Sequence, residues 1–134
     1  MSDSTTMQLR LYFEPVVEAE FEALVDLRGQ FWPAYMRHIV DNGKRVGLLT
    51  LKPEGDALKL QHLYLMPEAQ GDGIGTWAIE QVKVKARAQG RDVKLEALKQ
   101  SDANRFYLRH GFLHVAEEEF DVLYRWPVTQ GVVA

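Results

Sequence analysis

The sequence predicts an α/β (α+β) fold in which a mixed central sheet of six to seven strands is flanked by about four helices. Seven short segments rich in apolar and aromatic residues are typical of strands, and three longer stretches space their apolar residues as helices do. Glycine and proline separate these segments at short intervals. The 134 residues suffice for one domain with one hydrophobic core.

The N-terminal half predicts a strand, a helical region and a three-strand meander. Apolar residues have helical spacing from Val16 to about Tyr35, and Gly29 and Pro33 divide this region into two short helices or one kinked helix. Asn42-Gly43 predicts a hairpin because both residues accept a positive φ. The expected strands are 8–13, 37–40, 45–51 and 58–65.

The C-terminal half predicts two helices that alternate with strands. Apolar residues recur along one face from Ile74 to Gln89, and Gly90 is the expected C-cap. Ser101 is expected to cap a short helix that ends near His110. The strands on either side of the first helix should be parallel, as in a βαβ unit. The expected strands are 93–98, 113–115 and 120–126.

Composition excludes several classes of function. The net charge of −3 gives no general attraction to nucleic acid or to an anionic membrane. The chain has no cysteine, which excludes disulfides, thiolate metal sites and a cysteine nucleophile, and its four histidines lack close metal-ligand spacing. No stretch approaches the roughly 20 apolar residues that span a bilayer. We therefore expect a cytoplasmic enzyme or binding module that uses no metal and binds neither nucleic acid nor membrane.

The most informative segment joins the strand that ends near Met66 to the helix that begins at Ile74. A glycine-rich loop between a strand and a helix forms an anion pocket from main-chain N–H groups. The loop lacks the Lys-Ser/Thr of a P-loop, and its G-x-G-x-G spacing after a meander disfavours a dinucleotide-binding domain. A plain glycine-rich turn is the alternative interpretation.

Two motifs resemble the GCN5-related N-acetyltransferase (GNAT) superfamily. Gln70-x-x-Gly73-x-Gly75 is similar to the Q/R-x-x-G-x-G/A signature of that family, and Pro67 precedes it at the expected distance. The segment 103–112 resembles the family's A-x-x-F/L-Y-x-x-x-G-F segment. The expected order of elements is also the family's, so the resemblance extends from about Met7 to Trp126.

The resemblance implies a single N-acetyltransferase domain over residues 7–127 that uses acetyl-CoA, with 1–6 and 128–134 as flexible or peripheral tails. The strand before the loop should splay from the next strand, often with a bulge, to form a cleft for the pantetheine arm. Main-chain N–H groups between Gln70 and Thr76 would hold the pyrophosphate, and the N–H near Leu65 would face the thioester carbonyl. Asp72 is a departure, because a carboxylate that points into the loop would weaken pyrophosphate binding. The implied cofactor-binding residues are Leu65, Met66, Gln70, Gly71, Asp72, Gly73, Ile74, Gly75, Thr76, Ser101 and Asn104.

The resemblance also suggests the catalytic residues. Tyr107 is the expected general acid for the departing thiolate, and Phe106 is expected to take the packing role on the same helix. The alternative is that Tyr107 itself is a core aromatic residue. Glu96 is the first candidate base, and its alternative is a solvent-facing strand carboxylate. His62 is the second candidate, unless it is simply a hydrogen-bonded strand histidine, and a water is the third.

Other residues of the short helix and its flanks have weaker assignments. Ser101 and Asn104 are expected to contact coenzyme A; the alternatives are that Ser101 is only an N-cap and Asn104 only a surface residue. Arg105 and Arg109 either contact the phosphates of the coenzyme or are solvated. The acceptor, a primary amine of a small molecule or peptide, is expected between 21–38 and 117–124. An aromatic wall for the acceptor could be formed by Phe31, Trp32 and Tyr35, with plain core packing as the alternative. An anionic turn that attracts a positive acceptor could be formed by Glu117, Glu118 and Glu119, with a solvated turn as the alternative.

Two functions of other classes compete with N-acetyl transfer. A non-catalytic acyl-CoA-binding regulatory module would keep the fold and bind the coenzyme without turnover. A structural interaction domain would not bind the coenzyme at all. A homodimer is an alternative to a monomer in each case.

Overall fold

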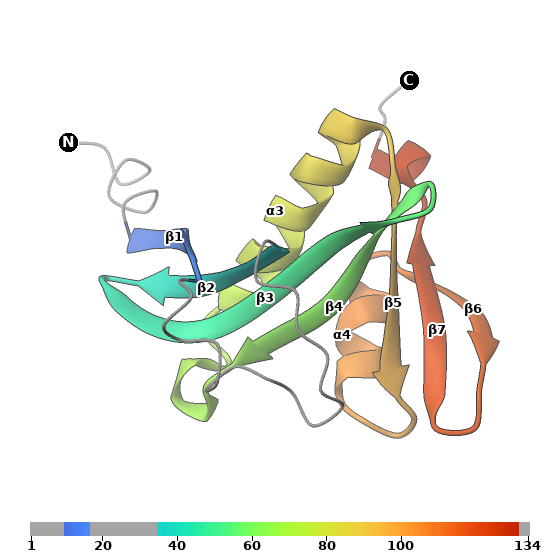
Figure 1. The fold of residues 1–134 in the computed structure, drawn as a ribbon. Coiled ribbons are helices and arrows are strands. Elements are labelled where there is room, and N and C mark those ends of the chain that lie inside the picture. The colour runs from blue at the N-terminus through green and yellow to red at the C-terminus, as the bar shows by residue number, and fades with distance from the viewer. Residues whose placement is uncertain (1–9, 17–34, 132–134) are drawn as a thin grey trace. The chain divides into compact units, whose positions relative to one another are not determined.

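The computed structural model describes residues 10–16 and 35–131, which fall into two compact units (Figure 1). The first unit comprises Met1–Leu51 and His62–Gly75, and the second comprises Lys52–Gln61 and Thr76–Ala134. The seven-stranded sheet has the order β1-β2-β3-β4-β5-β7-β6, which confirms the α/β class with a mixed sheet. The strands are β1 (Leu11–Pro15), β2 (Met36–Asp41), β3 (Lys44–Glu54), β4 (Ala57–Leu65), β5 (Asp92–Leu98), β6 (Leu113–Glu117) and β7 (Asp121–Trp126). The helices are α3 (Ile74–Gln89) and α4 (Ala103–Arg109), with 3-10 helices η3 (Pro67–Ala69) and η4 (Val128–Gly131).

In the first unit, β1, β2 and β3 form an antiparallel ladder. The predicted hairpin joins β2 to β3, with Asn42 at φ 50° and Gly43 at φ 80°. The register shifts between Ile39 and Val40, so the pairing changes from Ile39 opposite Gly47 to Val40 opposite Arg45. Val46 is therefore the extra residue of a β-bulge.

Gly47 on β3 lies unusually close to the last residues of β4. A Cβ atom at this position would stand 2.3 Å from the Tyr64 carbonyl oxygen and 2.9 Å from Leu65 Cδ2. The nearer atom belongs to the main chain and cannot move without displacing β4. Glycine at this position therefore allows the end of β4 to lie where it does.

Replacing Gly47 by alanine is expected to lower the free energy of unfolding by at least about 2 kcal/mol, because the new methyl group overpacks a backbone contact. Urea denaturation measures this change. Gly55→Ala is the control: Gly55 has φ 62° and nothing within 4 Å of its added Cβ, so it carries only backbone strain. An equal loss in both variants would show that close packing at Gly47 is unimportant.

In the second unit, the start of β4 pairs with β5 in parallel, which confirms the predicted orientation on either side of α3. This pairing extends from Ala57 opposite Asp92 to Lys59 opposite Lys94, although β4 has nine residues and β5 has seven. A bulge within β4 and a splayed cleft stay predictions. Figure 1 shows β5, β7 and β6 side by side, and their pairing is antiparallel.

Alternation along β5 creates two different faces in the second unit. Val93, Leu95 and Ala97 are buried, whereas the residues between them are partly or fully exposed. The buried core of this unit also includes residues from α3, α4, β7 and the segment between α4 and β6. These core residues are Ala78, Ile79, Val82, Ala86, Tyr107, Phe112, Val122, Tyr124 and Trp126.

Two expectations differ from the described structure. It contains two α-helices in residues 10–16 and 35–131 rather than about four, and nearly all of the first predicted helical region, 17–34, lies outside those ranges. Asp102, not Ser101, occupies the N-cap position of α4, and it does so in an α-helical conformation without a side-chain cap. Val128 begins η4 and donates its N–H to Asp92 Oδ1 at 2.8 Å, and the assignment of 128–134 to a flexible or peripheral tail stays a prediction.

Candidate active site

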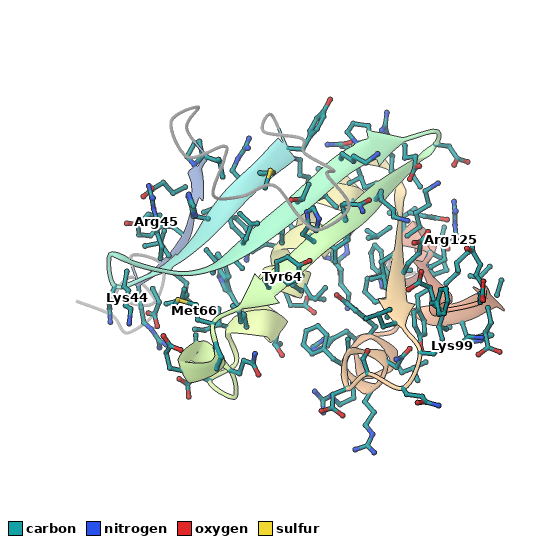
Figure 2. All side chains as sticks on the ribbon, turned by 60° about the horizontal axis from the view of Figure 1, so that its bottom comes forward. Lys44, Arg45, Tyr64, Met66, Lys99 and Arg125 are labelled. Atoms are coloured by element: carbon teal, nitrogen blue, oxygen red, sulfur yellow. The ribbon has the colours of Figure 1, made fainter. Side chains whose placement is uncertain are left out.

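The end of β4 presents a main-chain donor whose direction can be deduced. The Met66 N–H donates to the Val46 carbonyl on β3 at 2.8 Å. Successive amides of an extended chain point to opposite edges, so the Leu65 N–H points away from β3. Tyr64 and Met66 are exposed at this end of the strand (Figure 2).

The loop after β4 is fixed by η3 and by Gln70. The Gln70 N–H donates to the Pro67 carbonyl at 3.2 Å, and its side-chain Nε2 donates to the Leu65 carbonyl at 3.1 Å. Both groups of Gln70 thus serve the loop itself. Gly71 and Gly73 have φ angles of 87° and 80°, which side-chain-bearing residues rarely adopt.

A continuous run of main-chain donors follows Gln70. In the part of the chain that the structure describes, the N–H groups from Gly71 to Thr76 have no hydrogen-bond acceptor. Helix geometry explains the N–H groups of residues 74–76, because α3 begins at Ile74 and the first N–H groups of a helix have no acceptor within the helix. The arrangement suits an anion, since it combines free donors with the positive end of a helix dipole.

Asp72 lies in this loop, exposed, and has a cationic neighbour. Arg10 is ion-paired with Asp41 through an Nε–Oδ1 distance of 2.7 Å. The hydrogen bond and charge of Asp41 raise the pKa of Arg10, and the charge of Asp72 raises it further. Asp72 is therefore within electrostatic reach of a guanidinium that offsets part of its negative charge.

Tyr107 is part of an aromatic cluster in the second unit. Its ring centroid lies 5.3 Å from that of Phe106, 5.5 Å from Phe112 and 6.3 Å from Tyr124. Tyr107 is 9% exposed, whereas Phe106 is only half-buried. The expectation that Phe106 packs in the core in place of Tyr107 is therefore wrong, whereas the position of Tyr107 at the cleft stays a prediction. The role of Tyr107 as an acid stays a prediction.

Asn104 links three elements of the second unit. Its Nδ2 donates to the Leu98 carbonyl at 2.8 Å and to the Ser101 carbonyl at 3.0 Å. Its Oδ1 accepts the Tyr124 hydroxyl proton at 2.7 Å. Burial and Glu117 raise the pKa of Tyr124, which keeps this donor protonated. Asn104 is thus a structural residue that joins β5, α4 and β7, and its coenzyme contact, like that of Ser101, stays a prediction.

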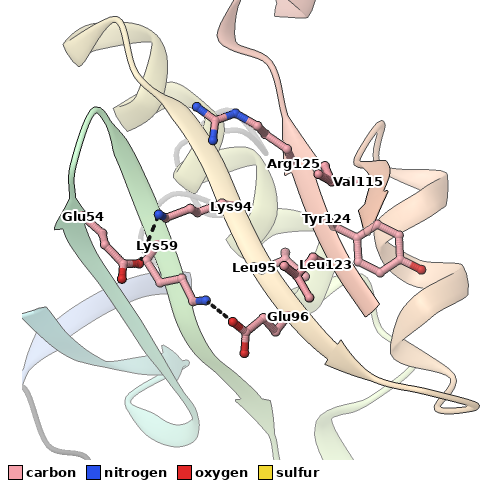
Figure 3. A pocket seen from close by; sticks show the side chains of 9 residues that line it. All are labelled: Glu54, Lys59, Lys94, Leu95, Glu96, Val115, Leu123, Tyr124 and Arg125. Atoms are coloured by element: carbon pink, nitrogen blue, oxygen red, sulfur yellow. Dashed lines mark hydrogen bonds and ion pairs between the residues drawn. The ribbon is translucent and has the colours of Figure 1, made fainter. Parts of the chain in front are cut away.

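Glu96 lines a pocket of about 230 Å³ on the more exposed face of β5 (Figure 3). Lys59 on β4 donates to Glu96 Oε1 at 3.0 Å, and Lys94 forms an ion pair with Glu54 at 3.5 Å. Glu96 is thus exposed, as its solvent-facing alternative expects, and it is also one half of an ion pair with Lys59, whereas its role as the base stays a prediction. The pocket is lined by Glu54, Lys59, Lys94, Leu95, Glu96, Val115, Leu123, Tyr124 and Arg125.

The other candidates for base and acceptor contacts have different surroundings. His62 is buried and its Nδ1 lies 2.9 Å from Thr50 Oγ1, as the hydrogen-bonded alternative expects. Tyr35 is 42% exposed, whereas Phe31 and Trp32 lie outside the described residues. Glu117, Glu118 and Glu119 are exposed at the end of β6 and the turn that follows it.

Sequence reasoning missed two residues that touch the candidate site residues. Lys59 was not singled out, because its contact with Glu96 depends on the register between β4 and β5. The sequence pattern places His110 near the end of the short helix and on its Phe106 face, but does not predict that its Nε2 lies 3.2 Å from Thr76 Oγ1. No local pattern signals either contact, since the partners are 37 and 34 positions apart in the chain.

A search for metal-binding groups of three or more acidic or histidine residues finds none among residues 10–16 and 35–131. No helix within those same ranges is long and apolar enough to cross a membrane.

Comparisons with known proteins agree on the fold. A search of curated proteins finds no match. Solved structures do match, including the PaiA N-acetyltransferase of Thermoplasma acidophilum in complex with coenzyme A, at 15% identity and a TM-score of 0.70 over 87% of this chain and 98% of that one. A GNAT acetyltransferase from Elizabethkingia anophelis with acetyl-CoA bound matches at 15% identity and a TM-score of 0.69, over 88% and 98%.

A plant enzyme complex is also similar. Arabidopsis thaliana Naa50 with the bisubstrate analogue CoA-Ac-MVNAL matches at 18% identity and a TM-score of 0.65, over 87% of this chain and 97% of that one. The family model described as "Acetyltransferase (GNAT) domain" matches residues 28–113, which is more than half of the chain. Together with the glycine loop and the order of elements, this match shows that the chain belongs to the GNAT acetyltransferase family.

Proposed function

We propose that this protein is an acetyl-CoA-dependent N-acetyltransferase that transfers acetyl directly to a primary amine of a small molecule or peptide. The observation that carries the proposal is the run of N–H groups from Gly71 to Thr76 without acceptors, at the start of α3. Such a run suits the pyrophosphate of coenzyme A. The similar structures with coenzyme A or acetyl-CoA bound support the same ligand.

The residues present fit the cosubstrate. The N–H groups from Gly71 to Thr76 would hold the pyrophosphate, and Gln70 would keep the loop in place through its bond to the Leu65 carbonyl. The Leu65 N–H, which points away from β3, would stabilise the developing oxyanion. Arg10 would reduce the repulsion that Asp72 exerts on the phosphates.

The reaction requires a neutral amine. An alkyl amine with a pKa of about 10.4 is neutral in only about one molecule in 2,500 at pH 7, which is equivalent to about 4.6 kcal/mol. Glu96 would accept a proton from the amine as its nitrogen attacks the thioester carbon. Tyr107 would donate its hydroxyl proton to the sulfur as the carbon–sulfur bond breaks, which yields an amide and free coenzyme A thiol.

The pocket of Glu96 is the proposed acceptor site. Lys59 donates to Glu96 Oε1 at 3.0 Å and has a side chain only 13% exposed, so its ammonium group offsets the charge of Glu96. An ammonium group that enters the pocket can replace Lys59 as the partner of Glu96. The carboxylate would then lie beside the amine whose proton it must take.

Replacing Glu96 by glutamine is expected to lower kcat/KM by about 30-fold at pH 7, because a water must then accept the proton. The loss should shrink at higher pH, where more of the amine is already neutral. Glu14→Gln is the control, since Glu14 is also a strand glutamate that accepts a hydrogen bond from an arginine, Arg45 Nε, at 3.0 Å. An identical pH profile in Glu96→Gln and the unaltered protein would rule out Glu96 as the base.

An amine-library screen for thiol release from acetyl-CoA, combined with thermal unfolding, tests the function. Turnover with a primary amine supports N-acetyl transfer. A rise in Tm with coenzyme A but no turnover on any amine would instead indicate the acyl-CoA-binding module, because ligand at 100 times its Kd adds about 2.7 kcal/mol of stability. The burial of Tyr107 among aromatic rings is the observation that favours this second function. No shift at all would contradict both.

A further inference from the structure

His110 is held by α4 but contacts α3. It is the C-cap residue of α4, and its N–H donates to the carbonyls of Phe106 and Tyr107 at 3.2 and 3.1 Å. Its ring packs on Phe106 with a centroid distance of 4.6 Å. The main chain and the ring are both fixed, so the position of Nε2 is set by α4.

The contact on α3 is Thr76, whose Oγ1 lies 3.2 Å from His110 Nε2. Thr76 is the third residue of α3 and is exposed, and its main-chain N–H is the last of the donors without an acceptor. The hydroxyl therefore belongs to the last residue of the candidate pyrophosphate run. What this hydroxyl offers a ligand depends on the hydrogen bond that it makes with His110.

We propose that His110 is a positioning residue for the coenzyme, and that its protonation turns the Thr76 hydroxyl into a hydrogen-bond donor for the pyrophosphate. This inference rests on the proposed function of the loop. A neutral imidazole can accept the Thr76 hydroxyl proton at Nε2, which leaves no proton for a ligand. A protonated imidazole donates from Nε2 to Oγ1, so the hydroxyl proton must point elsewhere.

The charges around His110 are compatible with a proton switch. Burial lowers the pKa of His110, and the positive charges of Lys83 and Arg109 lower it further. The negative charge of Glu80 raises this pKa and offsets part of the effect. These groups come from both helices, since Glu80 and Lys83 lie on α3 and Arg109 on α4. The ring is therefore mostly neutral at pH 7, and an adjacent pyrophosphate would raise its pKa and favour protonation.

The direction of the pH effect follows from this. If the complex holds the proton more tightly than the free protein, affinity rises as pH falls through the pKa of the complex. The gain is complete once the pH is below the pKa of the free protein, which lies below 6.5. Affinity should therefore be lowest at alkaline pH.

Dephospho-coenzyme A is the probe for the experiment. The 3′-phosphate of coenzyme A has a second pKa of about 6 and would titrate in the same range, whereas the pyrophosphate diester does not. We expect the Kd, measured by calorimetry at constant ionic strength, to be about tenfold lower at about pH 5.5 than at about pH 8. In His110→Gln the Kd should change less than about twofold over this range.

Two further variants separate the possible causes. His114→Gln should keep the full pH dependence, because His114 is an exposed residue on β6 that faces the Tyr124 ring at 6.2 Å. Thr76→Val keeps the shape of the side chain without the hydroxyl and should lose most of the pH dependence. If Thr76→Val keeps it while His110→Gln loses it, His110 acts by charge alone and the positioning role is overturned.

The titration of the His110 imidazole signal in NMR spectra should shift on ligand binding only if His110 is more than a structural residue. The His110 signal, identified by its absence in His110→Gln, should titrate at a higher pH when dephospho-coenzyme A is bound. If the unaltered protein binds the probe but its affinity does not vary with pH, or if the His110 titration does not move, the inference is wrong while the proposed function survives. If the unaltered protein binds neither the probe nor coenzyme A at any pH, the proposed function itself fails, and the inference with it.

Discussion

Replacing Gly73 by valine is expected to weaken coenzyme A binding by at least about 100-fold, because a β-branched residue cannot hold the φ of 80° that this loop requires. The loop would relax to a negative φ, which turns the neighbouring N–H groups away from their common direction. Each lost hydrogen bond to a charged group costs about 1.5–3 kcal/mol, so losing two of them suffices for this effect. Calorimetric titration with coenzyme A measures the change.

Gly43→Val is a closely matched control for this experiment. Gly43 has the same φ of 80°, and an added Cβ at either glycine meets no atom within 4 Å. Both variants should therefore lose a similar amount of stability, about 1–2 kcal/mol, from backbone strain. Only Gly73→Val should lose the coenzyme. Equal affinities in the two variants would show that the loop does not bind the pyrophosphate.

The elements were largely predictable because their signals are local. The helix from Ile74 to Gln89 was predicted with both its ends, since its apolar stripe stops at Gly90, which has the positive φ of a C-cap. The Asn42-Gly43 turn likewise follows from two residues that accept a positive φ. The strand bounds were less certain, and β6 extends two residues beyond the predicted Val115 because hydrogen bonds to β7 continue past the apolar run.

The side-chain partners in the site were not predictable, because they depend on register and on helix rotation. Glu96 was expected to be a base or a solvent-facing carboxylate, and the ion pair with Lys59, which the parallel register of β4 and β5 allows, was not predicted. The Gln70 side chain reaches back to the Leu65 carbonyl, a contact that its motif did not predict, and its cofactor contact stays a prediction. Neither a strand register nor a side-chain rotamer is encoded in a short motif.

Helix rotation explains the error at α4. Phe106 and Tyr107 are adjacent, so about 100° of rotation separates them on a helix, and either can face the sheet. Packing against Phe112 and Tyr124 decides in favour of Tyr107. The same packing leaves open which property of Tyr107 matters to the enzyme, its ring or its hydroxyl.

Replacing Tyr107 by phenylalanine separates these two properties. The ring and its aromatic contacts remain, and only the hydroxyl is lost, so the free energy of unfolding should change by no more than about 1.5 kcal/mol, the net contribution of a typical hydrogen bond. If the hydroxyl protonates the departing thiolate, kcat should fall by at least about 100-fold while the Kd for acetyl-CoA stays the same. Steady-state kinetics with the amine found in the screen, together with calorimetry, measure both quantities.

Tyr124→Phe provides the contrast within the same aromatic cluster. The Tyr124 hydroxyl donates to Asn104 Oδ1 at 2.7 Å, so its loss leaves a part-buried acceptor without this partner and should cost about 1–3 kcal/mol of stability. Its effect on kcat should be far smaller than that of Tyr107→Phe. Tyr107→Phe should therefore lower mainly kcat, and Tyr124→Phe should lower mainly the free energy of unfolding. If Tyr107→Phe also loses stability and keeps its rate, Tyr107 is a packing residue and another group must protonate the thiolate.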